Sequence, residues 1–145
     1  MKIRRWLGLI VSILVLVNAT MLPVMASTKA SYYLDSYAIG VSAKEDGKMI
    51  VTYGVYGTKT MDKIGADSLK IEMEVSTNNW VSIATIYGED HLDEFYSYDA
   101  LYHEGMYTFW GVPGNRYRVT MIAAASLNGG GDTGEIVSTP RLCKA

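Results

Sequence analysis

The segment from Gly88 to Gly105 concentrates the residues of this chain that are best suited to binding a ligand. Four of its six acidic residues are candidate calcium ligands: Glu89, Asp90, Asp93 and Glu94. Its candidate ligand-binding residues are Tyr96, Tyr98 and Tyr102. Tyrosines offer flat amphipathic contact area at modest entropic cost, and long loops on a β-scaffold often bind ligands. The alternative is an acidic crossover whose tyrosines cap the core, with a helical turn around Asp90 to Phe95.

Other reactive side chains do not form a recognisable catalytic or metal site. His91 and His103 lie twelve positions apart, whereas zinc ligands usually occur in pairs a few residues apart. Asp132-Thr133-Gly134 matches the triplet of aspartic proteases, but a glycine run precedes it and a second acid follows it. A turn between strands, with Asp132 bonding its own turn backbone, fits better. We therefore predict a non-enzyme without a cofactor, keep calcium as the alternative, and rank a small hydrolase third.

The N-terminal segment predicts a secretory signal peptide over residues 1–26. Lys2, Arg4 and Arg5 precede an apolar helical run, and small residues before Ser27 suit cleavage between Ala26 and Ser27. A retained anchor is the alternative, but a membrane-spanning helix needs about 20 apolar residues and this run is shorter. The sequence thus predicts a secreted, extracellular protein with no membrane attachment after cleavage.

Residues 27–145 are predicted to form a single domain that folds without cross-links. The 119 residues are enough for one compact core. The only cysteine, Cys143, cannot form an intramolecular disulfide, and we interpret it as an incidental thiol of a polar tail. Without the three basic residues of the leader, ten basic and fifteen acidic residues remain, a net charge of −5. Nucleic acid is therefore not an expected partner.

Alternation of apolar and polar residues predicts seven short strands and an all-β fold, a single antiparallel β-sandwich. The expected strands cover 33–43, 49–55, 69–75, 80–87, 106–112, 117–123 and 135–139. Turns are expected at Glu45 to Lys48, Asn78-Asn79 and Gly129 to Gly131. The polar stretch from Thr58 to Asp67 is predicted to be a loop.

The segment Pro113-Gly114-Asn115-Arg116-Tyr117-Arg118-Val119 resembles a corner of fibronectin type III domains, which are immunoglobulin-like sandwiches. In that corner a proline stands four residues before a tyrosine whose hydroxyl bonds back to nearby backbone. The resemblance makes Pro113 and Tyr117 the expected structural corner. The sequence departs from the family at Gly111, where leucine is usual.

The mature chain is also similar to an uncharacterised family of small secreted proteins from Gram-positive bacteria. The similarity rests on the segments Tyr32 to Asp35, Thr60 to Ala66 and Gly131-Asp132. It implies a bacterial extracellular protein and no particular activity.

These observations favour a secreted, non-catalytic sandwich that binds an extracellular glycan, wall component or protein through the segment 88–105. The alternative is a structural protein that associates edge to edge through its strands. The sequence leaves the ligand and the oligomeric state open.

Overall fold

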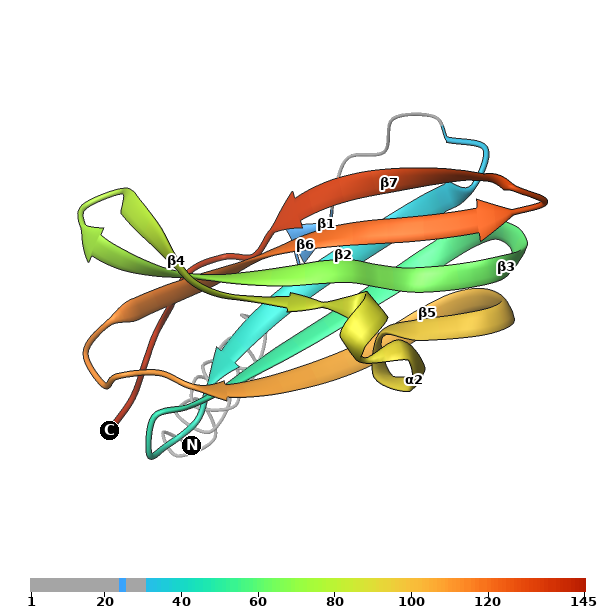
Figure 1. Cartoon of the computed structure of the whole chain (residues 1–145). Coiled ribbons are helices and arrows are strands. Elements are labelled where there is room, and N and C mark those ends of the chain that lie inside the picture. The colour runs from blue at the N-terminus through green and yellow to red at the C-terminus, as the bar shows by residue number, and fades with distance from the viewer. Residues whose placement is uncertain (1–23, 26–30) are drawn as a thin grey trace, which may run out of the picture.

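The computed structural model describes residues 24–25 and 31–145, which form a single curled sheet, mostly antiparallel (Figure 1). The strands are β1 (Val24–Met25), β2 (Leu34–Ala43), β3 (Lys48–Ser76), β4 (Asn79–Tyr87), β5 (Tyr96–Trp110), β6 (Arg116–Leu127), β7 (Gly130–Val137) and β8 (Arg141–Leu142). A 3-10 helix, η1 (Gly88–Asp90), and one helical turn, α2 (Leu92–Phe95), connect β4 to β5. The prediction of an all-β fold is confirmed for the described residues, which are mostly antiparallel strand.

The predicted leader lies outside the described residues, including its cleavage site at Ala26 and Ser27, apart from the short strand β1. Val24 and Met25 pair with Ile39 and Ala38 of β2. Within residues 24–25 and 31–145, no helix is long and apolar enough to cross a membrane.

Strand β3 is 29 residues long and runs through the segment from Thr58 to Asp67, so the loop predicted there is wrong. Its first half pairs with β2 and β5, and its second half pairs with β4 and β6. Met61, Ile64 and Ala66 are fully buried between the two halves. Register shifts flank this stretch, and such bulges bend a strand while disrupting its alternation. The polar pattern therefore reflects a bent strand.

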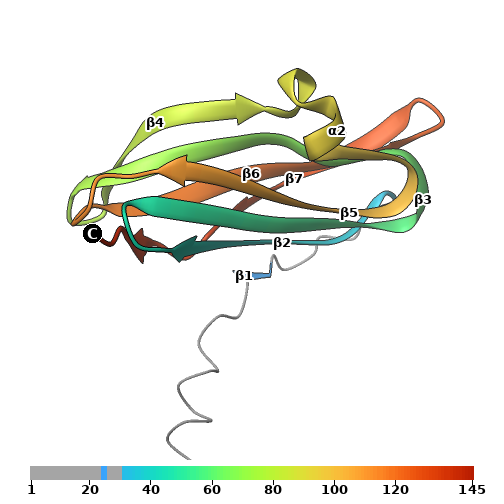
Figure 2. The ribbon, with the colours of Figure 1, turned by 90° about the horizontal axis from the view of Figure 1, so that it is seen from below.

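The core forms where the alternating pattern predicts it. Val51 and Val55 of β3 and Val119 and Met121 of β6 are fully buried. The curl of the sheet brings β2 into contact with β6 and β7, with which it does not pair (Figure 2). Apolar side chains from both halves of β3 therefore pack into one cluster.

Near the end of β3, two side chains have the opposite exposure to that predicted by the alternating pattern: Val75 is exposed and Glu72 is buried. Val75 is half exposed because the β3–β4 hairpin tip projects from the rest of the sheet (Figure 1). Glu72, on the face predicted to be solvated, is only 7% exposed. The exposure of Val75 and the burial of Glu72 both depend on neighbouring strands. The alternation of β3 alone does not reveal these neighbours.

The irregular segment predicted over 88–105 is shorter than expected, because β5 already begins at Tyr96. The helical turn considered around Asp90 to Phe95 is present as α2. The Glu94 carbonyl accepts hydrogen bonds from the Tyr53 hydroxyl, at 3.2 Å, and from His103 Nε2, at 3.1 Å. Because Phe95 is also buried, α2 packs against the core and is held there by these hydrogen bonds.

Strand β7 includes the Asp-Thr-Gly triplet that the sequence places in a turn. Asp132 pairs with Ala125 of β6, and the turn lies earlier, at Asn128 and Gly129, both with positive φ. The Asp132 carboxylate accepts a hydrogen bond from the Ser31 hydroxyl instead of bonding its own turn. The turn prediction for Asp132 is therefore wrong.

The C-terminal tail is packed, contrary to its interpretation as a polar extension. Strand β8 pairs with the start of β6, and Cys143 is buried. The Cys143 backbone N–H donates to the Asn115 carbonyl at 2.9 Å. Cys143 therefore belongs to the core.

The expected corner residues lie in the turn before β6 and at the start of β6. Pro113 is exposed, whereas Tyr117 is buried and its hydroxyl accepts a hydrogen bond from the Val112 N–H at 2.8 Å. A Cβ at Gly111 would lie 2.6 Å from Tyr117 Cε2 and 3.1 Å from Cys143 Sγ. The buried ring and thiol thus explain why this chain cannot hold a leucine at Gly111.

Candidate functional site

The structure does not bring the three candidate tyrosines into one site. Tyr96 and Tyr98 pair with Gly65 and Lys63 beyond the bend of β3, whereas Tyr102 pairs with Tyr56 in the first half of β3. Tyr98 and Tyr102 are 50% and 54% exposed, but Tyr96 is only 5% exposed. The strand β5 therefore carries these residues to two separate surfaces.

Tyr96 forms one wall of a cavity of about 500 Å³ over β3, β6 and β7. The Lys63 ammonium lies 3.7 Å above its ring centre, and its hydroxyl donates to Asp67 Oδ1 at 2.7 Å. Burial, followed by the Asp67 hydrogen bond, raises the pKa of Tyr96. Because both its ring face and its hydroxyl have partners within the protein, Tyr96 is poorly suited to stack on a ligand.

Tyr102 lies instead in a hollow of about 450 Å³ on the outer face of β2, β3 and β5. Its lining is Asp35, Ser36, Ala38, Tyr56, Gly57, Leu101 and Tyr102. A second hollow, of about 340 Å³, shares Ala38 and Tyr56 and is also lined by Thr52, Tyr53, Gly54, Glu104 and Gly105. We refer to the two adjoining hollows as the tyrosine groove.

Strand pairing explains why these side chains meet. Ser36 of β2 and Tyr102 of β5 are the partners of Tyr56 on either side of β3. The Tyr56 and Tyr102 rings stack with centroids 6.1 Å apart and planes inclined by 28°. Even-numbered residues of three neighbouring strands thus line one face of the sheet.

Glycine and alanine make room for the two rings. A Cβ at Gly54 would lie 2.8 Å from the Tyr56 hydroxyl, and Ala38 is the partner of Gly54 on β2. The Tyr56 side chain therefore extends over Gly54 toward Glu104, which pairs with Gly54 on β5. Its hydroxyl donates to Glu104 Oε1 at 2.6 Å.

The electrostatics of the groove disfavour an anionic ligand and suit a ligand that donates hydrogen bonds. The Glu104 hydrogen bond, followed by burial, raises the pKa of Tyr56, which keeps its phenol neutral. Of the residues that the structure describes, Asp35 and Glu104 are the charged ones in this lining, and no described lysine or arginine lines either hollow. Carboxylates repel anionic ligands and accept hydrogen bonds from hydroxyl or amide groups.

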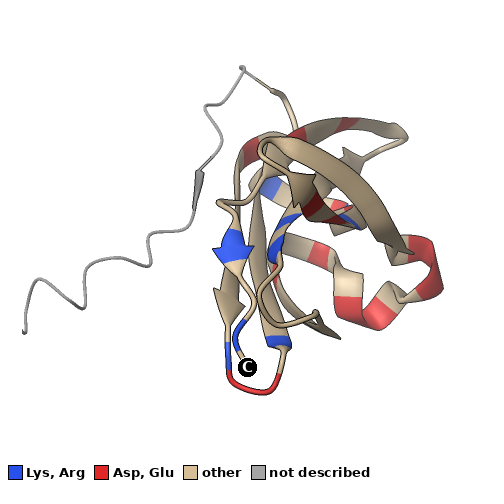
Figure 3. Cartoon of the chain, turned by 90° about the vertical axis from the view of Figure 1, so that its left-hand side faces the viewer, with Lys and Arg blue, Asp and Glu red and all other residues tan. Residues whose placement is uncertain are grey.

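The acidic segment has a different place, along η1 and α2 (Figure 3). Its four candidate calcium ligands, Glu89, Asp90, Asp93 and Glu94, are all exposed. In the described part of the chain, no group of three or more acidic, histidine or cysteine side chains is arranged to hold a metal ion.

The two histidines also lie in different environments. His91 Nδ1 is 3.9 Å from a Glu94 carboxylate oxygen at the surface. His103 is buried, and since a carbonyl can only accept, its Nε2–H donates to Glu94 and its Nδ1 accepts from the Ser97 hydroxyl at 2.9 Å. Burial lowers the pKa of His103. Both of its nitrogens hold the chain around α2.

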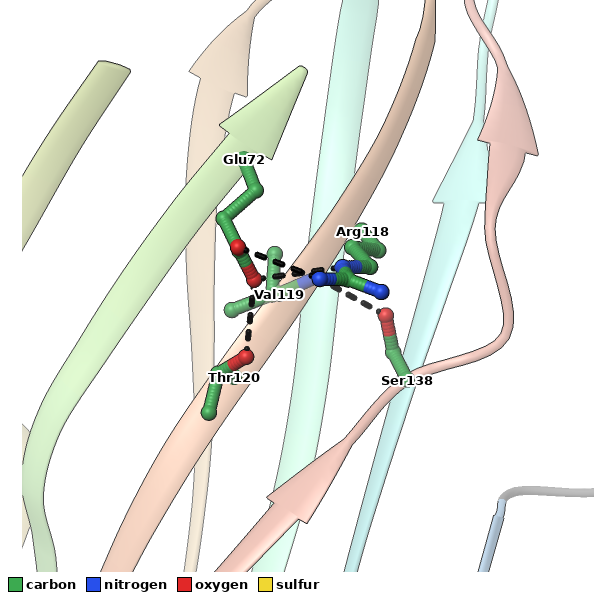
Figure 4. Close-up of polar contacts among 5 residues, drawn as sticks. All are labelled: Glu72, Arg118, Val119, Thr120 and Ser138. Atoms are coloured by element: carbon green, nitrogen blue, oxygen red, sulfur yellow. Dashed lines mark hydrogen bonds and ion pairs between the residues drawn. The ribbon is translucent and has the colours of Figure 1, made fainter. Parts of the chain in front are cut away.

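The buried carboxylate of Glu72 also has a structural explanation (Figure 4). Arg118 donates to both of its oxygens at 3.2 Å, and the Thr120 hydroxyl donates at 2.9 Å. Burial alone would raise the pKa of Glu72, but these hydrogen bonds and the Arg118 charge outweigh it and lower the pKa. The guanidinium also lies 4.5 Å from the Trp80 ring centre. The cluster joins β3, β4 and β6.

The sequence pattern did not predict four residues of the tyrosine groove: Tyr56, Glu104, Asp35 and Ala38. Of these, Tyr56 could have been recognised in the sequence, because an aromatic residue on the solvent-facing side of an otherwise alternating strand indicates a binding surface. Its pairing with Tyr102, 46 positions away, appears only in the fold.

No protein-family model, no curated protein and no solved structure matches this chain.

Proposed function

We propose that this protein is a secreted, non-catalytic module that binds a neutral extracellular glycan in the tyrosine groove. The proposal includes a sandwich of the fibronectin type III kind. In support, β2, the first half of β3 and β5 pair in that order, as do β4, the second half of β3, β6 and β7. The hydrogen bond from the Val112 N–H to the Tyr117 hydroxyl also resembles the one that tyrosine makes in the corner of that fold.

The observation that carries the binding proposal is the stacked pair Tyr56 and Tyr102 beside a floor of small residues. A tyrosine that is half exposed and held by a neighbour offers an apolar face with little entropy left to lose. The apolar face of a sugar ring can lie against such a surface, while its hydroxyls donate to Asp35 and Glu104. Groove size, neutral aromatic surface and carboxylate acceptors thus suit the same ligand.

Binding is best tested with the protein purified after secretion, on glycan arrays and on insoluble cell walls. Tyr102→Ala and Tyr56→Ala are expected to weaken binding by about tenfold or more, equivalent to roughly 1.4 kcal/mol. Tyr98→Ala is the matched control, because Tyr98 is equally exposed on β5 but lies outside the groove. Binding that survives both groove substitutions, or fails equally in Tyr98→Ala, contradicts the groove assignment.

Two further outcomes would distinguish glycan binding from the two alternatives, a protein partner and hydrolysis of the glycan. Capture of a protein but no polysaccharide from the extracellular medium would replace the glycan with a protein partner. New reducing ends released from a bound glycan would show hydrolysis and refute the non-catalytic assignment.

A further inference from the structure

Strand β4 has a free edge. It pairs with β3 along one side and with no described strand along the other, and it lies at the margin of the sheet (Figure 2). Alternate residues of an antiparallel strand direct their backbone N–H and C=O away from the partner. β4 therefore presents a row of unpaired donors and acceptors, which the backbone of another β-strand satisfies best.

The sequence of β4 leaves this edge almost unprotected. Asn79–Tyr87 contains neither a charged residue nor a proline, the usual protection of edge strands. Every other described strand longer than two residues contains at least one charged side chain. Val81 and Ile83 are exposed as well. The protective devices of β4 are two register shifts against β3, one between Ser82 and Ala84 and one between Asn79 and Trp80 at the hairpin end.

We propose that β4 pairs with β4 of a second copy of this chain, antiparallel about a twofold axis, so that one sheet continues through a dimer. Twofold symmetry brings a strand against itself in the antiparallel direction. Among the described strands longer than two residues, only β4 combines an uncharged sequence with an edge that no described strand covers, since β1 pairs with the middle of β2. Asp99 and Glu104 in β5, and Asp132 and Glu135 in β7, would repel their own copies at those edges.

The dimer is independent of glycan binding. The tyrosine groove is built from β2, β3 and β5, so pairing at the far edge of β4 leaves it open. Ile83, at the midpoint of β4 and 48% exposed, would lie near the twofold axis. A lysine there would place two ammonium groups close to each other in the dimer and point into water in the monomer.

Sedimentation velocity of the secreted, processed protein over about a hundredfold range of concentration tests this proposal. We expect a concentration-dependent dimer for the wild type, a monomer for Ile83→Lys, and an unchanged dimer for Met106→Lys. Met106 is 65% exposed on β5, outside both β4 and the groove. A wild type that stays monomeric, or an equal loss of dimer in both variants, overturns the proposal.

Hydrogen exchange supplies a second measurement that needs no substitution. The β4 amides directed away from β3 are expected to gain protection as protein concentration rises, because they become bonded across the dimer. A dimer in which these amides stay unprotected would have another interface and would refute strand pairing. Glycan binding by Ile83→Lys is expected to equal that of the wild type.

Discussion

Removing the Tyr117 hydroxyl tests whether the corner before β6 stabilises the fold as the structure indicates. Tyr117→Phe keeps the buried ring and deletes one acceptor, to which Val112 N–H donates at 2.8 Å. A hydrogen bond contributes about 1 kcal/mol net, and a buried donor left without a partner costs about 1–3 kcal/mol. Because the Val112 side chain is exposed, water can reach its amide, so we expect a loss of about 1 kcal/mol.

Urea unfolding, followed by tryptophan fluorescence, measures this loss. We expect the midpoint to fall and the slope to stay constant, since the substitution hardly changes the surface exposed on unfolding. Tyr107→Phe is the matched control: Tyr107 is partly buried against the core, and its hydroxyl makes no hydrogen bond within the described residues. A Tyr117→Phe variant no less stable than the control would refute the role assigned to the hydroxyl.

Three further predictions concern packing, acid sensitivity and calcium. Gly111→Ala should destabilise the protein by about 1–3 kcal/mol in the same urea assay, because its Cβ would lie 2.6 Å from a ring carbon of Tyr117; an unchanged midpoint would contradict this. The folded state lowers the pKa of His103 below 6.5 and that of Glu72 below 4.5, so the unfolded chain binds both protons more readily. Thermal unfolding should therefore show stability falling with pH below 6.5 and again below 4.5, and Glu72→Gln should lack the second loss; an identical profile in the variant would contradict that assignment. Millimolar calcium or a chelator should leave the melting temperature unchanged, because the exposed carboxylates form no metal-binding group within the described residues; a calcium-dependent rise would show a site.

The tyrosine groove illustrates why a site on a sheet is hard to predict from spacing along the chain. Tyr96, Tyr98 and Tyr102 are close in sequence, yet the bend of β3 directs the start and the middle of β5 to different surfaces. Tyr56 is distant in sequence from Tyr102 and stacks on it. Proximity in a sheet depends on register between strands, which a local pattern does not encode.

Burial of polar residues shows the same dependence on neighbours. Glu72 alternates with apolar residues in β3 as a solvent-facing residue should, and it is buried because Arg118 and Thr120 of β6 face it. The Asp-Thr-Gly triplet around Asp132 looks like a turn in sequence, and pairing with β6 makes it a strand. In both cases the contact that decides the outcome comes from a distant segment.

Three features follow from the amino-acid sequence: the all-β character, the core faces of β3 and β6, and the reversal at Asp46 and Gly47, both of which have positive φ. These features are local, because side chains alternate along a strand with a period of two and glycine favours tight turns. Three others emerge only in the folded protein: residues 58–67 are strand, Tyr102 stacks on Tyr56, and one edge of β4 has no partner among the described strands. Each of these depends on which strands become neighbours. Strand neighbours are set by contacts between segments that are distant in sequence, and these contacts form only when the whole chain buries its apolar surface.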